Sequence, residues 1–185
     1  MNLANKITLF RILLVPVFLV IALLQIPGYG DFLAACVFAL AAATDGVDGH
    51  IARSRNQITV FGKFMDPLAD KLLVCSALVA LVQMGRLDAW IPIVVISREF
   101  AVMGLRAIAA AQGEVIAASK LGKFKTVAQI VAVLALFLQY TSFFNTSVFH
   151  ILAQVFVYAS VFFTVYSGVD YLAKGWVFLF PKDKQ

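Results

Sequence analysis

The chain has 185 residues, of which 62% are hydrophobic and only 14% are charged, and its mean hydropathy is +0.93. Soluble domains carry about a quarter charged residues, so this composition excludes a disordered segment and a nucleic-acid-binding domain and predicts lipid as the solvent. A spanning helix needs about 20 residues, which leaves room for roughly six spans. We therefore expect residues 1–185 to form a single all-α, polytopic membrane domain with six transmembrane helices.

The first two apolar segments are separated by clear turn residues. The first covers about 7–26 and stops at Pro27 and Gly28; no cleavage-site pattern follows it, so we expect it to be retained. The second runs from about 32 to 53. Its charge-free part, 32–44, is too short to cross a bilayer alone. The acidic residues that follow are therefore expected on the same helix, near one membrane face.

Four further spans follow in the remaining sequence. The third is expected to begin at Pro67, a residue suited to a first helical turn, and the fourth to cover about 89–111. The charge-free stretch 126–169 is long enough for two spans, and a polar cluster at 141–147 divides it. Aromatic residues alternate with lysines over 174–184, which is typical of an interfacial segment.

Basic residues gather on one side of this predicted topology. Only Arg86 falls on the other side. An excess of Lys and Arg marks the cytoplasmic side, so we expect a multi-pass protein of the cytoplasmic (inner) membrane with both termini and the active site facing the cytoplasm. The residues on the crowded side are Lys6, Arg11, Arg53, Arg55, Lys63, Lys71, Arg98, Arg106, Lys120, Lys123, Lys125, Lys174, Lys182 and Lys184.

Four of the ten acidic residues fall within 26 positions: Asp45, Asp48, Asp66 and Asp70. The members of each pair are three or four residues apart, so each pair shares one helical face. Carboxylates beside a span are costly and are functional candidates by default. Oxygen-only ligands favour hard divalent cations such as Mg²⁺ or Mn²⁺. The alternative is that these aspartates form ion pairs with neighbouring basic residues, which are Arg53, Arg55, Lys63 and Lys71.

The acidic residues also belong to a longer pattern. Residues 45–70 resemble the signature of the CDP-alcohol phosphotransferase family, D-x-x-D-G-x-x-A-R-x8-G-x-x-x-D-x-x-x-D. All eight fixed letters are present at the right spacing, as Asp45, Asp48, Gly49, Ala52, Arg53, Gly62, Asp66 and Asp70. The resemblance implies a six-span membrane enzyme, a homodimer, and two divalent cations, Mg²⁺ or Mn²⁺.

The resemblance also implies a role for each motif residue. The metal ligands would be Asp45, Asp48, Asp66 and Asp70, and Asp70 would also take the proton from the attacking hydroxyl. The family's donor is a CDP-lipid such as CDP-diacylglycerol, and its phosphatidyl group passes to an alcohol with release of CMP. The residues that would receive this donor are Asp45, Asp48, Gly49, Ala52, Arg53 and Gly62, with Gly62 shaping the turn between the two acidic helices.

Three other segments resemble the branch of the family whose acceptor is sn-glycerol 3-phosphate. They are Asn5–Thr8 with Arg11 and Pro16, Ser97–Phe100 with Arg106, and Ser119–Thr126 with Gln129. A phosphorylated acceptor needs a cationic site, and arginine is especially suited to bind phosphate. The candidate residues are Arg98, Arg106, Lys120, Lys123 and Lys125. Positive-inside anchoring is the alternative role for the three lysines.

Two other functions compete with this prediction. One is the same chemistry with another acceptor, such as inositol phosphate or serine. The other is a membrane cation transporter that uses the aspartates as an ion path. The position of the acidic residues near the membrane edge, and the lack of an internal sequence repeat, count against the transporter.

Overall fold

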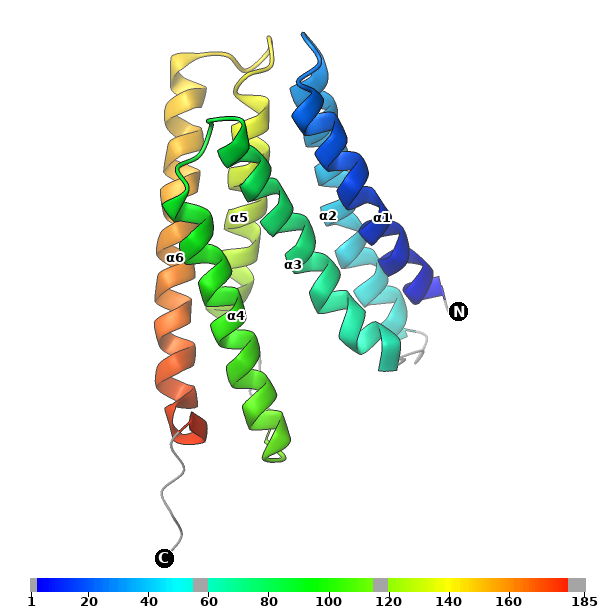
Figure 1. Cartoon of the computed structure of the whole chain (residues 1–185), viewed down its shortest axis with the longest axis vertical. Helices are drawn as coiled ribbons and strands as arrows, with labels where there is room; N and C mark the ends of the chain where they lie inside the picture. The colour runs from blue at the N-terminus through cyan, green and yellow to red at the C-terminus, as the bar shows by residue number, and fades with distance from the viewer. Residues whose placement is uncertain (1–2, 55–59, 115–119, 180–185) are drawn as a thin grey trace, which may run out of the picture.

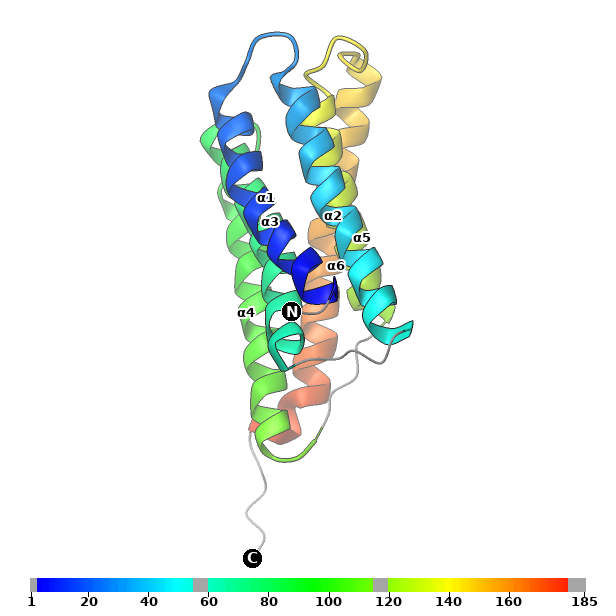
Figure 2. The same cartoon turned by 90° about the vertical axis from the view of Figure 1, so that its right-hand side faces the viewer.

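The computed structural model describes residues 3–54, 60–114 and 120–179, in which every regular element is an α-helix (Figures 1 and 2). Within these ranges the description of side chains omits residues 3–4, 45–54, 60–64, 66–67, 120 and 179. The six helices are α1 (Leu3–Leu24), α2 (Gly30–Ser54), α3 (Val60–Gln83), α4 (Trp90–Ala111), α5 (Lys120–Leu138) and α6 (Ser147–Leu179).

The helices run alternately up and down in one bundle (Figures 1 and 2). The most extensive contacts are between α5 and α6, α1 and α2, α4 and α6, and α1 and α3. Helix α5 also touches α2 and α3, so it joins the first half of the chain to the second. The end of α2, the start of α3, the end of α4 and the start of α5 all lie at the same end of the bundle, which we call the basic end.

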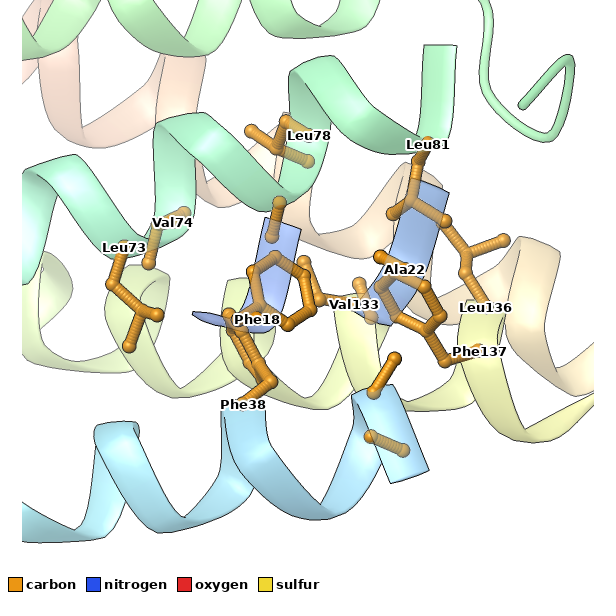
Figure 3. Packing of buried hydrophobic residues seen from close by; sticks show 14 of the residues in the cluster. Phe18, Ala22, Phe38, Leu73, Val74, Leu78, Leu81, Val133, Leu136 and Phe137 are labelled. Carbon is orange, nitrogen blue, oxygen red and sulfur yellow. The ribbon is translucent and has the colours of Figure 1, made fainter. Parts of the chain in front are cut away.

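Large apolar side chains fill the space between α1, α2, α3 and α5 (Figure 3). Phe18 of α1 is fully buried, and its ring centroid lies 5.6 Å from the rings of both Phe38 in α2 and Phe137 in α5. Leu73 and Leu81 of α3 close the same cluster. Phe18 therefore packs α1 against both α2 and α5, and α3 closes the same core.

The prediction of six helices is confirmed, and three of them pass a test of length and hydropathy for crossing a membrane. These are the segments Asn5–Leu24, Leu121–Leu138 and Ser147–Phe178. In α2 only Gly30–Thr44 is apolar, because the acidic motif follows it on the same helix. That all six helices cross a bilayer stays a prediction.

The start of α3 differs from the sequence-based expectation. Helix α3 begins at Val60, so Pro67 lies inside it and not at its start. Proline costs one backbone hydrogen bond there, which the rest of a long, well-packed helix can offset. The connection between the acidic helices is correspondingly shorter, and Gly62 lies on the first turn of α3 and not in the turn before it. Helix α6 continues to Leu179, so Trp176 lies on its last turns. The interfacial position predicted for 174–184 stays a prediction, because 180–184 lie outside the described residues.

Arg86 lies at the opposite end of the bundle, just after α3. Its guanidinium binds the carboxylate of Asp31 at the start of α2 through both amino groups, one of them at 3.0 Å. The same guanidinium stacks on the ring of Tyr140, 4.1 Å from the ring centroid. The single basic residue predicted for this side thus joins the connection after α3 to the start of α2 and to the connection after α5.

Candidate active site

The acidic motif occupies two neighbouring helix ends. Asp45 and Asp48 lie in the last turns of α2, and Asp66 and Asp70 lie in the first turns of α3. Both helix ends lie at the basic end of the bundle, although Figure 2 shows them apart from each other there; α2 and α3 are in contact as helices. The side chains of Asp45, Asp48 and Asp66 lie outside the described residues. At the level of the backbone, the fold places the two predicted pairs at the same end of the bundle.

The motif's last aspartate lines a narrow crevice between α3, α4 and α5. Asp70 is half-buried, and the crevice also presents Lys71, Glu99, Lys125 and Gln129. Its volume is about 10 Å³, which is room for about one water molecule. The predicted base and one of the predicted acceptor-binding lysines therefore face the same small space.

Glu99 is the centre of the charge cluster in this crevice. Its carboxylate is bound by Lys71 from α3 and Lys125 from α5, each on a different oxygen. Arg98, its neighbour on α4, donates to the same oxygen as Lys125 at 3.0 Å. The Glu99 side chain is 8% exposed and that of Lys125 is 6% exposed. Three cations from three helices thus surround one buried carboxylate.

A second cationic group lies between α4 and α6. Arg106 donates a hydrogen bond to the hydroxyl of Tyr171 at 2.7 Å, and both Arg98 and Arg106 lie over the Tyr171 ring, at 5.5 and 5.1 Å from its centroid. Arg98 also donates to the Ser167 hydroxyl at 3.0 Å. Arg98 therefore links the Glu99 cluster to the tyrosine, and Arg106 extends the basic surface toward the end of α4.

The five predicted acceptor-binding residues do not form one cluster. Lys125 and Arg98 meet at Glu99, whereas Arg106 is exposed, and its described contact with this group is through Tyr171, over which Arg98 also lies. Lys123 is also exposed, and Lys120 is the first residue of α5 with its side chain outside the described residues. Alternate residues of a helix point to different sides, which separates Lys123 from Lys125.

Sequence reasoning did not identify three residues of this region. Glu99 lies in the segment Ser97–Phe100 that resembles the family but was given no role there, although a carboxylate at that depth is itself rare. Tyr171 had no sequence signal beyond a ring in an apolar helix. Lys71 was considered only as a partner for the aspartates. Its described ion pair is instead with Glu99.

The N-terminal helix also reaches the acidic motif. Arg11 of α1 is fully buried, and its Nε donates to the hydroxyl of Thr44, the residue before Asp45, at 3.3 Å. Beside this contact, α1 and α2 line an open apolar groove of about 350 Å³ with Lys6 among its residues. A buried cation and an apolar surface groove thus lie next to each other where the acidic motif begins.

The donor set of the motif suits a hard divalent cation. All four candidate ligands are carboxylates at one end of two adjacent helices, without cysteine or histidine among them. Among the side chains that the structure describes, no group of three or more His, Cys, Asp or Glu could hold a metal. Three of the four candidates fall outside that description, so the metal site stays a prediction.

Comparison with known proteins gives a consistent result. The family model described as CDP-alcohol phosphatidyltransferase matches residues 1–166. The chain is 50% identical to the "CDP-diacylglycerol--glycerol-3-phosphate 3-phosphatidyltransferase" of Bacillus subtilis (strain 168), over 95% of both chains. It is 37% identical to the protein of the same name in Haemophilus influenzae, over 94% of both chains. It is 42% identical to the "Probable phosphatidylglycerophosphate synthase" of Mycobacterium tuberculosis (strain ATCC 25618 / H37Rv), over 94% of this chain and 81% of the other. This chain therefore belongs to the CDP-alcohol phosphatidyltransferase family.

Proposed function

We propose that this protein transfers the phosphatidyl group of CDP-diacylglycerol to sn-glycerol 3-phosphate, giving phosphatidylglycerol phosphate and CMP. The observation that carries the proposal is the crevice in which Asp70, the last aspartate of the family motif, adjoins the cations held by Glu99. The names of the relatives support both substrates.

The lipid donor is expected to lie against α1 and α2. The apolar groove beside Thr44 suits an acyl chain, because it is lined by Ile7, Phe10, Leu40 and Ala43. Next along α2, Gly49 and Ala52 are small residues, which would let the cytidine and pyrophosphate approach the helix closely. Arg53 would contribute positive charge to the pyrophosphate, and Gly62 would keep the start of α3 free of a side chain.

Asp45, Asp48, Asp66 and Asp70 are the residues that would hold two divalent cations, Mg²⁺ or Mn²⁺. When bound, such cations would neutralise charge on the pyrophosphate and on the departing CMP. The protein's own contribution is to hold these carboxylates on two rigid helix ends that pack against one core.

The reaction forms a bond from the acceptor's hydroxyl oxygen to the phosphorus that carries diacylglycerol. The bond from that phosphorus to the CMP oxygen breaks, and CMP leaves with its electron pair. Asp70 would accept the proton of the hydroxyl, because it is the half-buried carboxylate that lines the acceptor's crevice. The acceptor's phosphate would be bound by Arg98 and Lys125, with the more exposed basic residues Arg106, Lys120 and Lys123 attracting it toward the site.

The basic end is proposed to face the cytoplasm, where both substrates' polar groups would be found. Family membership leads us to propose a homodimer in the inner membrane as well. Neither proposal alters the chemistry above, which uses residues of one chain.

A direct assay tests the proposed function. Purified protein in detergent or in vesicles is supplied with CDP-diacylglycerol, Mg²⁺ and one alcohol at a time, and the release of CMP is measured. We expect CMP release that depends on glycerol 3-phosphate and stops when the cation is chelated. Release with inositol phosphate or serine in place of glycerol 3-phosphate would change the acceptor, and ion flux without CMP release would indicate a transporter.

A further inference from the structure

We propose that Glu99 is a positioning residue of the acceptor site, whose carboxylate holds Lys71 and Lys125 beside Asp70 so that both ammonium groups can bind the acceptor's phosphate. This inference rests on the proposed function, since it concerns the same acceptor. Phosphate binding requires positive charge, and the proposal adds a negatively charged residue that holds the positive ones in place.

The arrangement of the ion pairs carries the argument. Lys71 binds Oε2 of Glu99, whereas Lys125 binds Oε1. The two lysines come from α3 and α5, and Glu99 itself comes from α4. A single carboxylate therefore fixes two side chains that no other described ion pair connects. Without it the two ammonium groups would repel each other in a poorly solvated space and move apart.

The balance of charge shows that the cluster is more than a self-contained ion pair. Arg98 is a third cation on the same carboxylate, so three cations face the two carboxylates of Glu99 and Asp70 and positive charge remains in excess. A buried ion pair that served stability alone would be balanced, because excess buried charge is costly. The excess is suited to an incoming anion with more than one negative charge, such as a phosphate monoester.

The exposure of the two lysines indicates how an anion would reach them. The Lys71 side chain is 27% exposed, whereas that of Lys125 is 6% exposed. Lys71 also follows Asp70 directly in α3. An acceptor's phosphate would therefore meet Lys71 first, and its hydroxyl group would then lie on the side of Asp70.

The test uses Glu99→Gln in the full-length protein, with KM measured separately for glycerol 3-phosphate and for CDP-diacylglycerol. Glutamine keeps the size of the side chain but loses the charge that binds the lysines. We expect the KM for glycerol 3-phosphate to rise by about tenfold or more, which corresponds to the loss of one charged hydrogen bond, and the KM for CDP-diacylglycerol to change little. Equal changes in both constants, no change, or a lower KM for the acceptor would overturn the proposal.

Two further variants separate positioning from folding. Asp31→Asn removes the carboxylate of the Arg86 pair at the opposite end of the bundle, and we expect it to change neither KM selectively. Glu99→Asp keeps the charge but shortens the side chain, and we expect an acceptor KM between those of the wild type and Glu99→Gln. If Glu99→Gln does not fold, an unchanged acceptor KM in a folded Glu99→Asp protein would overturn the proposal. A wild-type protein that is inactive with glycerol 3-phosphate would instead refute the proposed function.

Discussion

Asp70 is the residue at which the family motif meets the crevice that we propose for the acceptor. Its neighbour Lys71 binds Glu99, and Lys125 binds the same carboxylate from α5. The half-buried position of Asp70 suits a base, because a carboxylate in such a space is reached by one hydroxyl group and by little water.

Asp70→Asn is expected to remove turnover but to leave binding of the lipid donor in place. Loss of a general base lowers rates by about 10²- to 10⁴-fold, and asparagine keeps the shape of the side chain. The measurements are CMP release at saturating substrates and binding of CDP-diacylglycerol by titration calorimetry. Asp170→Asn, which alters a carboxylate paired with Lys174 on α6, is the matched control and should stay active. Substantial turnover by Asp70→Asn would exclude Asp70 as the base.

The aspartates and the Glu99 cluster differ in how far sequence could predict them. The spacing of Asp66 and Asp70 is a property of one helix, so sequence places them on one face. The partners of Glu99 are at positions 71, 98 and 125, and only the packing of α3, α4 and α5 brings them together. Sequence therefore predicted Arg98 and Lys125 as acceptor-binding cations, but neither Lys71 nor the carboxylate that joins the three.

At the scale of elements, α6 approaches α4 closely because two of its residues lack side chains. A Cβ atom at Gly168 would lie 3.0 Å from Cγ of Arg98, and one at Gly175 would lie 2.2 Å from Cδ2 of Leu105. These contacts place Tyr171, which lies between the two glycines on α6, against Arg98 and Arg106.

Gly175→Ala is expected to lower stability, and Gly104→Ala is its control. Overpacking costs about 1–3 kcal/mol, and the added methyl group at Gly175 would overlap Leu105. At Gly104, on α4, a Cβ atom would have nothing within 4 Å, so alanine should stabilise the helix by up to about 1 kcal/mol. Thermal unfolding of both variants in the same detergent measures the difference. Equal midpoints would show that α4 and α6 are not packed as closely as described.

Sequence predicted the number of helices better than their ends. Long apolar runs identify α1, α5 and α6 directly. A proline suits a first helical turn, so the sequence predicts that α3 begins at Pro67, whereas the structure begins the helix at Val60, where the packing of the later turns offsets the proline. Helix α6 continues past Gly175, which packs against Leu105.

At the scale of the whole molecule, charge separates the two ends of the bundle. Arg86 is neutralised by Asp31 at one end, whereas the Glu99 cluster keeps an excess of cations toward the other. This asymmetry is the basis for proposing that the basic end is cytoplasmic.

Labelling of single cysteines in intact cells tests that orientation. In a background with Cys36 and Cys75 replaced, Ser142→Cys lies in the exposed connection between α5 and α6, and Glu114→Cys lies in the exposed segment after α4. We expect a membrane-impermeant maleimide to modify position 142 in intact cells and position 114 only after the cells are opened. The reverse pattern would place the basic end outside.

The unequal lengths of the helices have a consequence for how substrates would arrive. Helix α6 has 33 residues and is therefore about 50 Å long, whereas a bilayer's apolar core is about 30 Å thick. At the basic end, α4 and α6 extend beyond the ends of α2 and α3 (Figure 1). In a membrane, the acidic helix ends would then lie at the depth of the lipid phosphates, below the rim formed by α4 and α6. A lipid donor could reach them by lateral diffusion within its leaflet. A water-soluble alcohol would instead approach from the aqueous side, along the basic residues of α4.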